Sequence, residues 1–347
     1  MQKKTNNITL LQVSKHAGVS KTTASVALSG GAYISDKARL SVIASAQELG
    51  YVYNRAAASL RSNSSSTVGL IIPDLNNSFY TALLTGVSKE LNKFKKTILL
   101  GSTFESLEVQ DRLIASMLEN RVCGIILFAV LGTSNDLLLK IKNFGIPVVL
   151  VNRDSPEFTC DYIGIDDILA GKLATEHLIK KGHCRIAYLG GASELTSWHK
   201  RKEGYESILK KYNIEVDQSL IIEGPPTQES GYILVEDILK LEELPTAIFC
   251  YNDVIAIGAM MKLEEKGIIP GKDISIVGVD DIPEASIIKP KLTSVSSFPF
   301  IRGTKAANIL YNYTEGYIGE PQTIILEPKL IIRDSCSNKS DITNSKN

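Results

Sequence analysis

Short apolar segments alternate with longer segments of helical periodicity over most of the chain, and this alternation limits the possible folds more than any other feature. In residues 77–95, for example, apolar side chains repeat every four residues, as on one face of an amphipathic helix. Nearly continuous apolar segments joined by helices are typical of buried parallel strands in βα units. The apolar segments are residues 67–72, 97–102, 123–130, 147–152, 162–166, 185–191, 246–253 and 274–281.

These segments make up about eight βα units, which are enough for one closed barrel or for two open, doubly wound sheets. Polar segments near residues 153–160 and 290–293 suit chain crossings between two sheets. Residues 61–66, with the sequence RSNSSS, are polar and typical of a linker. The sequence therefore predicts an α/β body that begins near residue 67, preceded by a separate smaller part.

Charge is distributed unequally between these two parts, although the net charge of the chain is zero. Residues 1–65 contain eight basic and two acidic side chains, so this segment carries a charge of +6 and the remainder carries −6. A basic segment on an acidic body predicts a polyanionic partner for the basic segment alone.

Composition excludes several other classes of protein. With 44% hydrophobic and 22% charged residues, the chain is not predicted to be mainly disordered. No segment approaches the roughly 18 apolar residues of a membrane-spanning helix, and the N-terminus resembles no secretory signal. We therefore expect a cytoplasmic protein without a membrane partner. The cysteines form neither a disulfide framework nor a CxxC pair, at positions 123, 160, 184, 250 and 336.

The basic segment contains three predicted helices. Thr9, Ser20 and Ser35 can each cap a helix, and Gly18 supplies the left-handed conformation that a tight turn between the first two requires. Two short helices joined in this way are typical of a helix-turn-helix motif, although any helical hairpin can show the pattern. In the third helix, the side chains expected to face inward are Val42, Ile43, Ala46 and Leu49.

The segments AGVSKTTASVALSG and ISDKARLSVIASAQELGYVYNRAAASLRS resemble the DNA-binding part of the lactose/galactose-repressor (LacI/GalR) family. The resemblance extends over the whole chain. It implies an all-α helix-turn-helix head and two doubly wound α/β lobes similar to periplasmic binding proteins. The implied parts are a DNA-binding domain (1–52), a hinge helix and linker (53–66), an N-terminal lobe (67–162 with 294–323), a C-terminal lobe (163–293 with 324–334) and a disordered tail (335–347).

The resemblance also implies the residues that contact DNA. Lys21 and Thr22 match positions that contact base edges, while Val26 stands where many relatives have a base-contacting arginine. In the hinge, Leu60 matches an apolar side chain that enters the minor groove and kinks the duplex. The matched phosphate contacts are Thr9, Ser20, Thr23 and Ser25, and the matched hinge residues are Asn54, Ala57, Leu60 and Arg61.

Polar side chains follow several of the predicted strands, where ligands of doubly wound sheets bind. Each single Asp or Asn is more often a helix cap, but their convergence favours a hydrogen-bonding cleft. The resemblance implies effector contacts at Ser78, Phe79, Arg201, Asn252 and Asp280, although Phe79 also fits the apolar stripe of its own helix. Several segments, including PDLNNSFY and CYNDVIAIGAM, look closest to repressors of maltose regulons.

Taken together, these features predict a regulator of transcription, and the family resemblance implies that it is a repressor. The expected partners are a near-palindromic double-stranded DNA operator, a small-molecule effector of the sugar class and a second copy of the chain in a homodimer. No nucleotide-binding, zinc-protease or serine-hydrolase motif is present, so we expect no enzyme, cofactor or metal. The alternatives are a secreted sugar-binding protein and a sugar-metabolising α/β enzyme.

Overall fold

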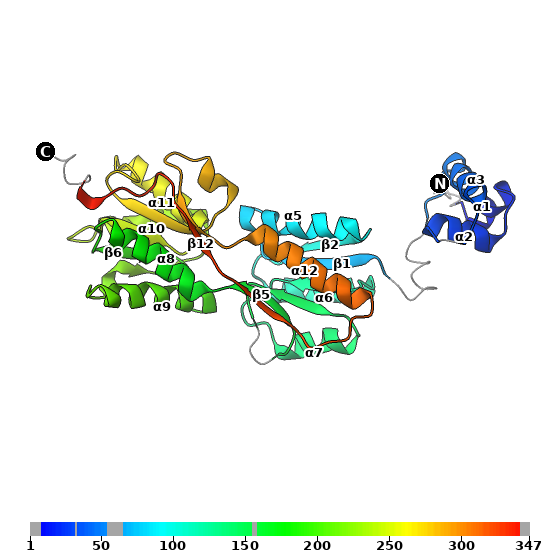
Figure 1. Cartoon of the computed structure of the whole chain (residues 1–347), viewed down its shortest axis with the longest axis horizontal. Coiled ribbons are helices and arrows are strands. Elements are labelled where there is room, and N and C mark those ends of the chain that lie inside the picture. Colours follow the sequence, from blue (N-terminus) through cyan, green and yellow to red (C-terminus); the bar gives the residue numbers. More distant parts are fainter. Residues whose placement is uncertain (1–7, 32, 54–64, 155–157, 341–347) are drawn as a thin grey trace, which may run out of the picture. The chain divides into compact units, whose positions relative to one another are not determined.

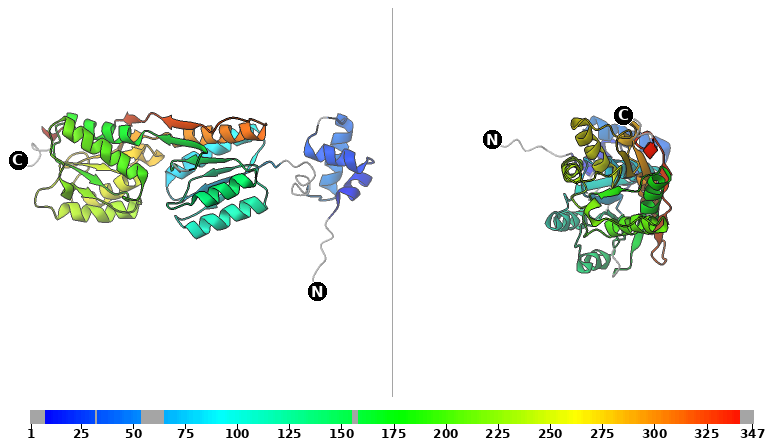
Figure 2. Two further views of the ribbon diagram at one scale, coloured as in Figure 1. Left: turned by 90° about the horizontal axis from the view of Figure 1, so that it is seen from below. Right: turned by 90° about the vertical axis from the view of Figure 1, so that its left-hand side faces the viewer.

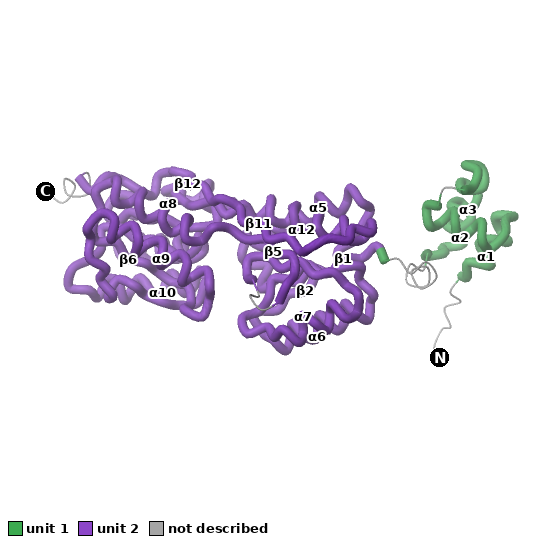
Figure 3. The backbone as a smooth tube through the Cα atoms, turned by 60° about the horizontal axis from the view of Figure 1, so that its bottom comes forward, with its two compact units in different colours: residues 1–65 green, residues 66–347 purple. Residues whose placement is uncertain are grey.

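A computed structural model describes residues 8–31, 33–53, 65–154 and 158–340. The chain divides into two compact units, residues 1–65 and 66–347, which are coloured separately in Figure 3. We call the first unit the head. None of the helices in the described part of the chain is long and apolar enough to cross a membrane.

The head contains three helices: α1 (Leu10–His16), α2 (Lys21–Ser29) and α3 (Asp36–Glu48). Ser35 caps α3, as the sequence predicts. Ile43 does not face inward, since it is 37% exposed. The buried stripe of α3 runs through Val42 and Ala46, which lie one turn apart, and Ile43 is rotated about 100° away from Val42. The core joins all three helices through Leu10, Val13, Ala24, Ala27, Val42 and Ala46.

The second unit contains two six-stranded sheets, which confirms the doubly wound fold and excludes the closed barrel (Figure 1). In the first sheet every pairing is parallel. Its order is β11 (Thr323–Leu326), β5 (Asp161–Ile165), β4 (Val148–Val151), β3 (Ile125–Leu127), β1 (Thr67–Ile72) and β2 (Thr97–Ser102).

In the second sheet only the pairing of β12 with β10 is antiparallel. Its order is β12 (Lys329–Ile331), β10 (Thr293–Ser296), β9 (Ser275–Asp280), β8 (Ala247–Cys250), β6 (Ile186–Leu189) and β7 (Ile221–Ile222). We call the first sheet with its helices the N-lobe and the second sheet with its helices the C-lobe.

Helices cover both sheets. In the N-lobe, α5 (Ser78–Lys93) and α12 (Pro299–Thr314) lie side by side on one face, and α6 (Leu107–Glu119) and α7 (Asn135–Asn143) cover the other (Figure 2). In the C-lobe, the paired helices are α8 (Asp167–Lys180) with α9 (Thr196–Lys211), and α10 (Gln228–Leu239) with α11 (Asp253–Glu265). Short 3₁₀ helices occupy Gln218–Leu220 and Pro283–Ser286.

Glycines allow the paired helices to approach closely. A Cβ atom added to Gly171 of α8 would lie 2.1 Å from the carbonyl oxygen of Arg201 on α9, and one added to Gly204 would lie 2.2 Å from that of Ile168. Only glycine fits at such contacts. This close approach holds the segment of α9 around Arg201 against the first turns of α8.

The chain passes between the lobes three times, after β5, after β10 and around β11 to β12. The expected boundaries at 162/163, 293/294 and 323/324 fall inside strands, which continue to Ile165, Ser296 and Leu326. The strands extend to these residues because each keeps a hydrogen-bonded neighbour there, as where Leu326 pairs with Ile165. Each crossing therefore lies about three residues later than the sequence indicated.

The expectation of a disordered tail from residue 335 is wrong for residues 335–340. The side chains of Ser335 and Cys336 are buried. Ser335 Oγ accepts a hydrogen bond from the backbone N of Thr293 and donates one to the carbonyl of Ile276. The segment is polar in sequence, but it is held by hydrogen bonds to the C-lobe, which need no apolar side chains. Residues 341–347 lie outside the described part.

Candidate functional site

The N-terminus of α2 is built by a side-chain cap. Ser20 Oγ accepts a hydrogen bond from the backbone N of Thr23 at 3.0 Å and lies 2.8 Å from Thr23 Oγ1. At α1, Thr9 Oγ1 accepts from the backbone N of Gln12, whose side chain in turn accepts from the backbone N of Thr9. Thr9 and Ser20, both predicted phosphate contacts, therefore fix the starts of the two helices.

The side chains at the start of α2 face away from the head's core. Lys21 and Thr22 are exposed, and Thr23 and Ser25 are partly exposed, whereas Ala24 and Ala27 are buried. Helical periodicity thus places the predicted base contacts on the outer face, where a DNA groove can reach them.

Not all of the basic residues in the head are free to contact a polyanion. The guanidinium of Arg39 donates hydrogen bonds to the carbonyl oxygens of Ala27 and Gly31 and so holds the end of α2. Lys15, Lys21 and Lys37 are exposed. The predicted hinge residues Asn54, Ala57, Leu60 and Arg61 lie outside the described residues.

In the second unit, strand ends of both lobes meet at a cavity of about 350 Å³. Of the predicted effector contacts, Phe79, Arg201, Asn252 and Asp280 line this cavity. Ser78 does not line it, because its hydroxyl donates to the carboxylate of Glu284 in the C-lobe.

Arg201 forms the most deeply buried ion pair of this cavity. Its side chain is 4% exposed, and Nε lies 2.8 Å from Asp167 Oδ1 at the start of α8. Its Nη1 donates to the carbonyl of Tyr251, and its Cζ lies 4.6 Å from the centroid of the Tyr251 ring. Burial opposes the charged form, but the neighbouring Asp167 carboxylate raises the pKa of Arg201 above its ordinary value. The arginine is therefore a fixed cation in the cavity wall.

Asn252 and Asp280 combine a structural contact with a position in the cavity wall. Asn252 caps α11, since its Oδ1 accepts a hydrogen bond from the backbone N of Ile255 at 3.0 Å. Asp280 ends β9 with a φ of +121° and accepts a hydrogen bond from Ser297 Oγ at 2.9 Å. Burial raises the pKa of the Asp280 carboxyl. Asn252 therefore both caps a helix and lines the cavity, so the two interpretations of this residue are compatible.

Sequence reasoning missed Arg153, which follows β4. Its Nη1 and Nη2 each lie 2.8 Å from an oxygen of Glu105, and Nη1 also donates to the carbonyl of Ala129. Burial acts against its charge, but the hydrogen bonds to Glu105 raise its pKa. The segment PVVLVNRD carried the signal, because polar residues follow a predicted strand there as they do elsewhere.

Three other aromatic side chains were also missed. Phe104, Phe128 and Tyr251 line the cavity with Phe79 and its neighbour Tyr80, the two aromatic residues that the sequence pointed to. Tyr80 and Phe128 pack edge to face, with ring centroids 5.1 Å apart. Apolar faces beside hydrogen-bonding groups are typical of small-molecule sites.

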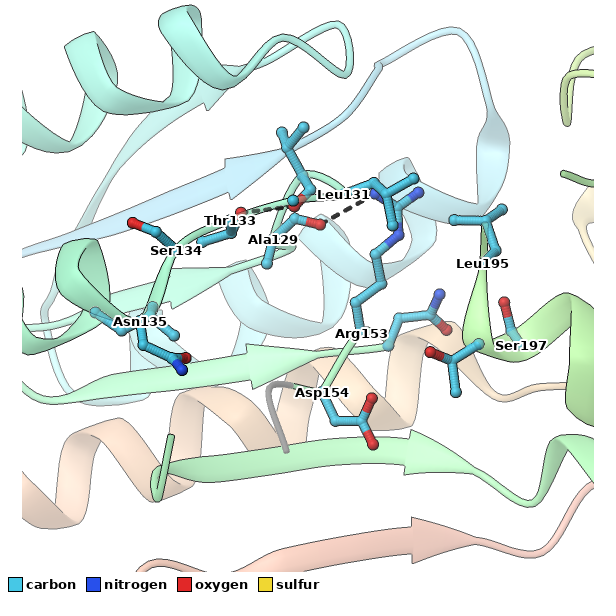
Figure 4. Close-up of a pocket in the computed structure, with 14 residues that line it drawn as sticks. Ala129, Leu131, Thr133, Ser134, Asn135, Arg153, Asp154, Leu195 and Ser197 are labelled. Carbon is cyan, nitrogen blue, oxygen red and sulfur yellow. Dashed lines mark hydrogen bonds between the residues drawn. The ribbon is translucent and has the colours of Figure 1, made fainter. Parts of the chain in front are cut away.

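A second cavity of about 400 Å³ adjoins the first, and both are lined by Asn152, Arg153 and Leu195. Figure 4 shows Arg153 between the loop that carries Ala129 and the segment that carries Leu195 and Ser197. Among the described residues, this second cavity is lined by aliphatic side chains and by hydroxyl, amide and carboxylate groups, with no aromatic ring; its polar residues include Thr133, Ser134, Asn135, Asp154 and Ser197.

Among the described residues, no group of three or more His, Cys, Asp or Glu side chains is arranged to hold a metal ion. Neither cavity is lined by a histidine or a cysteine. The lining groups can donate and accept hydrogen bonds and stack on a ring, which is what binding of a small polar molecule requires.

Comparison with known proteins defines the class. Residues 9–54 match the family of bacterial regulatory proteins, lacI family. Residues 65–331 match the family of periplasmic binding proteins and sugar binding domain of LacI family. The chain belongs to the LacI family and is a DNA-binding regulator of transcription rather than an enzyme.

Individual relatives cover nearly the whole chain. The HTH-type transcriptional repressor PurR of Vibrio atlanticus is 30% identical over 327 residues, which are 94% of this chain and 98% of PurR. The structure of a transcriptional regulator CelR–cellobiose complex matches with a TM-score of 0.71 and 29% identity, covering 95% of this chain and all of that one. A LacI family regulator from Enterococcus faecium with bound ribose matches with a TM-score of 0.70 and 29% identity, covering 78% of this chain and 99% of that one.

Proposed function

We propose that this regulator is a repressor that binds a near-palindromic operator as a homodimer, and that a sugar bound between its lobes controls the binding. The cavity lined by both lobes carries the proposal, because a ligand that contacts both can favour one lobe arrangement over another. Two similar regulators have sugars in their structures, one cellobiose and the other ribose.

The composition of the cavity supports a sugar. Aromatic rings such as Phe79 and Tyr251 offer apolar faces to a pyranose, and Arg153, Asn252 and Asp280 offer hydrogen bonds to hydroxyl groups. We include maltose among the candidates, on the resemblance of several segments to repressors of maltose regulons.

In the head, we propose that Lys21 and Thr22 contact base edges and that Thr9, Ser20, Thr23 and Ser25 face phosphates. One recognition helix contacts one half-site, so a dimer is needed for a palindrome. We place the hinge in residues 53–66, with Leu60 as the minor-groove wedge, and the working protein in the cytoplasm with its DNA.

Calorimetry on the full chain tests the effector class, with maltose, cellobiose, ribose and glucose as ligands and mannitol as a control. We expect at least one of the sugars to bind in a one-to-one ratio per chain. Loss of that binding in Asn252→Ala would place it in the cavity. If none of the four sugars released or absorbed heat, the proposed effector class would be wrong.

A further inference from the structure

Arg302, in the first turns of α12, lies behind the wall of the cavity and contacts two of its lining residues. Its side chain is fully buried. Nη1 donates a hydrogen bond to Oδ1 of Asn152 at 2.5 Å, and Cζ lies 4.8 Å from the centroid of the Phe79 ring. Asn152 follows β4 and Phe79 belongs to α5, so one guanidinium joins the two N-lobe elements that form this part of the wall.

Stability alone does not account for an arginine at this position. Nε and Nη2 of Arg302 are buried and have no hydrogen-bond partner among the described residues. Burial lowers the pKa of Arg302, and the carboxylates of Asp280 and Asp167 only partly oppose this effect. A buried cation with unpaired donors destabilises a fold, and an apolar side chain of similar size is usually tolerated better.

The contact with Arg302 decides which way the Asn152 amide faces. A guanidinium has only donors, so the amide can meet it only through its oxygen. The NH₂ group of Asn152 is then directed elsewhere, and it donates to none of the residues that the structure describes. Asn152 lines both cavities, so its two N–H donors are available to a molecule bound there.

We propose that Arg302 is a positioning residue for the effector site. It holds Asn152 as a hydrogen-bond donor toward the cleft. The inference rests on the proposed sugar effector and deepens it: the bound sugar places an acceptor oxygen, from a hydroxyl group or the ring, against the Asn152 amide. An effector group that can only donate would be rejected at this position.

A double-mutant cycle of binding affinities tests this on the full chain. The variants are R302M, N152A and R302M/N152A, and the ligand is whichever of maltose, cellobiose, ribose and glucose binds the wild type most tightly. We expect N152A to weaken binding about 10-fold and R302M about 3- to 10-fold, which is the range for one lost hydrogen bond. The double variant should bind no more weakly than N152A, because Arg302 acts through Asn152.

Two further variants separate positioning from simple destabilisation. N152D keeps an oxygen for Arg302 but has no donor, so it should lose affinity as N152A does, while its melting temperature should be no lower than that of the wild type because the carboxylate pairs with the guanidinium. R185M removes a partly buried arginine that pairs with Asp217 at 2.6 Å, away from both cavities, and should bind the sugar like the wild type.

The inference is overturned if R302M binds the sugar as tightly as the wild type, or if it weakens binding by the same factor in the N152A background. If no sugar binds the wild type, the proposed effector class fails, and melting temperatures test the contact itself. N152A should then lower the melting temperature in the wild-type background, where Arg302 loses its acceptor, and much less in the R302M background. Changes that simply add would overturn the coupling of Arg302 to Asn152.

Discussion

Replacing Arg201 by methionine should destabilise the C-lobe as well as alter the effector site. The substitution leaves the carboxylate of Asp167 and the carbonyl of Tyr251 without the guanidinium that satisfies both. Both residues are buried, with exposed fractions of 6% and 7%. Removing one partner of a buried ion pair costs about 3–5 kcal/mol. This is a large part of the free energy of unfolding of a domain, which is roughly 5–15 kcal/mol.

Unfolding of the C-lobe can be followed with a tryptophan that the chain already contains. Trp198, its only tryptophan, is buried on α9 three residues before Arg201, and its Nε1 donates to the carbonyl of Gly190 at 3.2 Å. Tryptophan fluorescence in a urea titration therefore reports the unfolding of the C-lobe. Lys202→Met, at the next position of the same helix, removes an i,i+4 pair with Glu206 and a cation–π contact with Trp198, whose ring centroid lies 5.8 Å from Lys202 Nζ. Both contacts are partly exposed, so the substitution should cost less than about 1 kcal/mol.

A second substitution tests the physical reason. R201M combined with Asp167→Leu replaces the ion pair with apolar side chains and should recover most of the lost stability, since no buried charge is left unpaired. If R201M costs less than about 1 kcal/mol, or if the double variant is less stable than R201M, the pair does not have the assigned role. The effect of R201M on effector binding should be measured without urea, under conditions where Trp198 fluorescence shows that the C-lobe is folded.

Three other outcomes follow from the structure. Burial lowers the pKa of His177 to about 4 from 6.5, so the native state binds fewer protons than the unfolded state between these values, and stability should fall as pH decreases from about 6.5 to 4. The loss of stability should be no more than about 2 kcal/mol for this partly exposed ring. In His177→Gln, the urea concentration at half-unfolding should depend less on pH than it does in the wild type. A chain that ends at residue 334 should melt several degrees below the full chain in calorimetry, because it lacks Ser335, which satisfies backbone groups of the C-lobe. A chain that ends at residue 340 keeps Ser335 and should melt like the full chain. Lys21→Ala should change the base preference of the head in a DNA selection, whereas Lys37→Ala should weaken all sequences alike; equal weakening by both would make Lys21 a phosphate contact.

The fold was predictable because its signals are local. Apolar segments indicated the parallel strands, and the polar residues that follow them indicated the cleft. Asn252 and Asp280 lie there together with Arg201, which the family resemblance implied. The caps at Thr9 and Ser20 were visible for the same reason, since a cap depends on residues three positions apart.

The parts that were not predicted depend on contacts between distant residues. Ser78 was assigned to the cleft, but its hydroxyl is taken by Glu284, 206 positions away in the sequence. Arg302 meets Asn152 across 150 positions, and no pattern near either residue indicates the contact. Sequence periodicity says which face of an element is buried, but it does not say which buried polar groups meet there.

The most direct test of the central claim measures operator binding with and without a sugar. A DNA site is first enriched from a random library with the full chain, and its affinity is then followed by fluorescence anisotropy. We expect a near-palindromic site, bound by two chains, whose affinity changes at least about 10-fold when a saturating sugar is present, a coupling of about 1.4 kcal/mol. If the enriched DNA shows no common sequence, or if no sugar that binds the chain changes its affinity, the account of an effector-controlled regulator is contradicted.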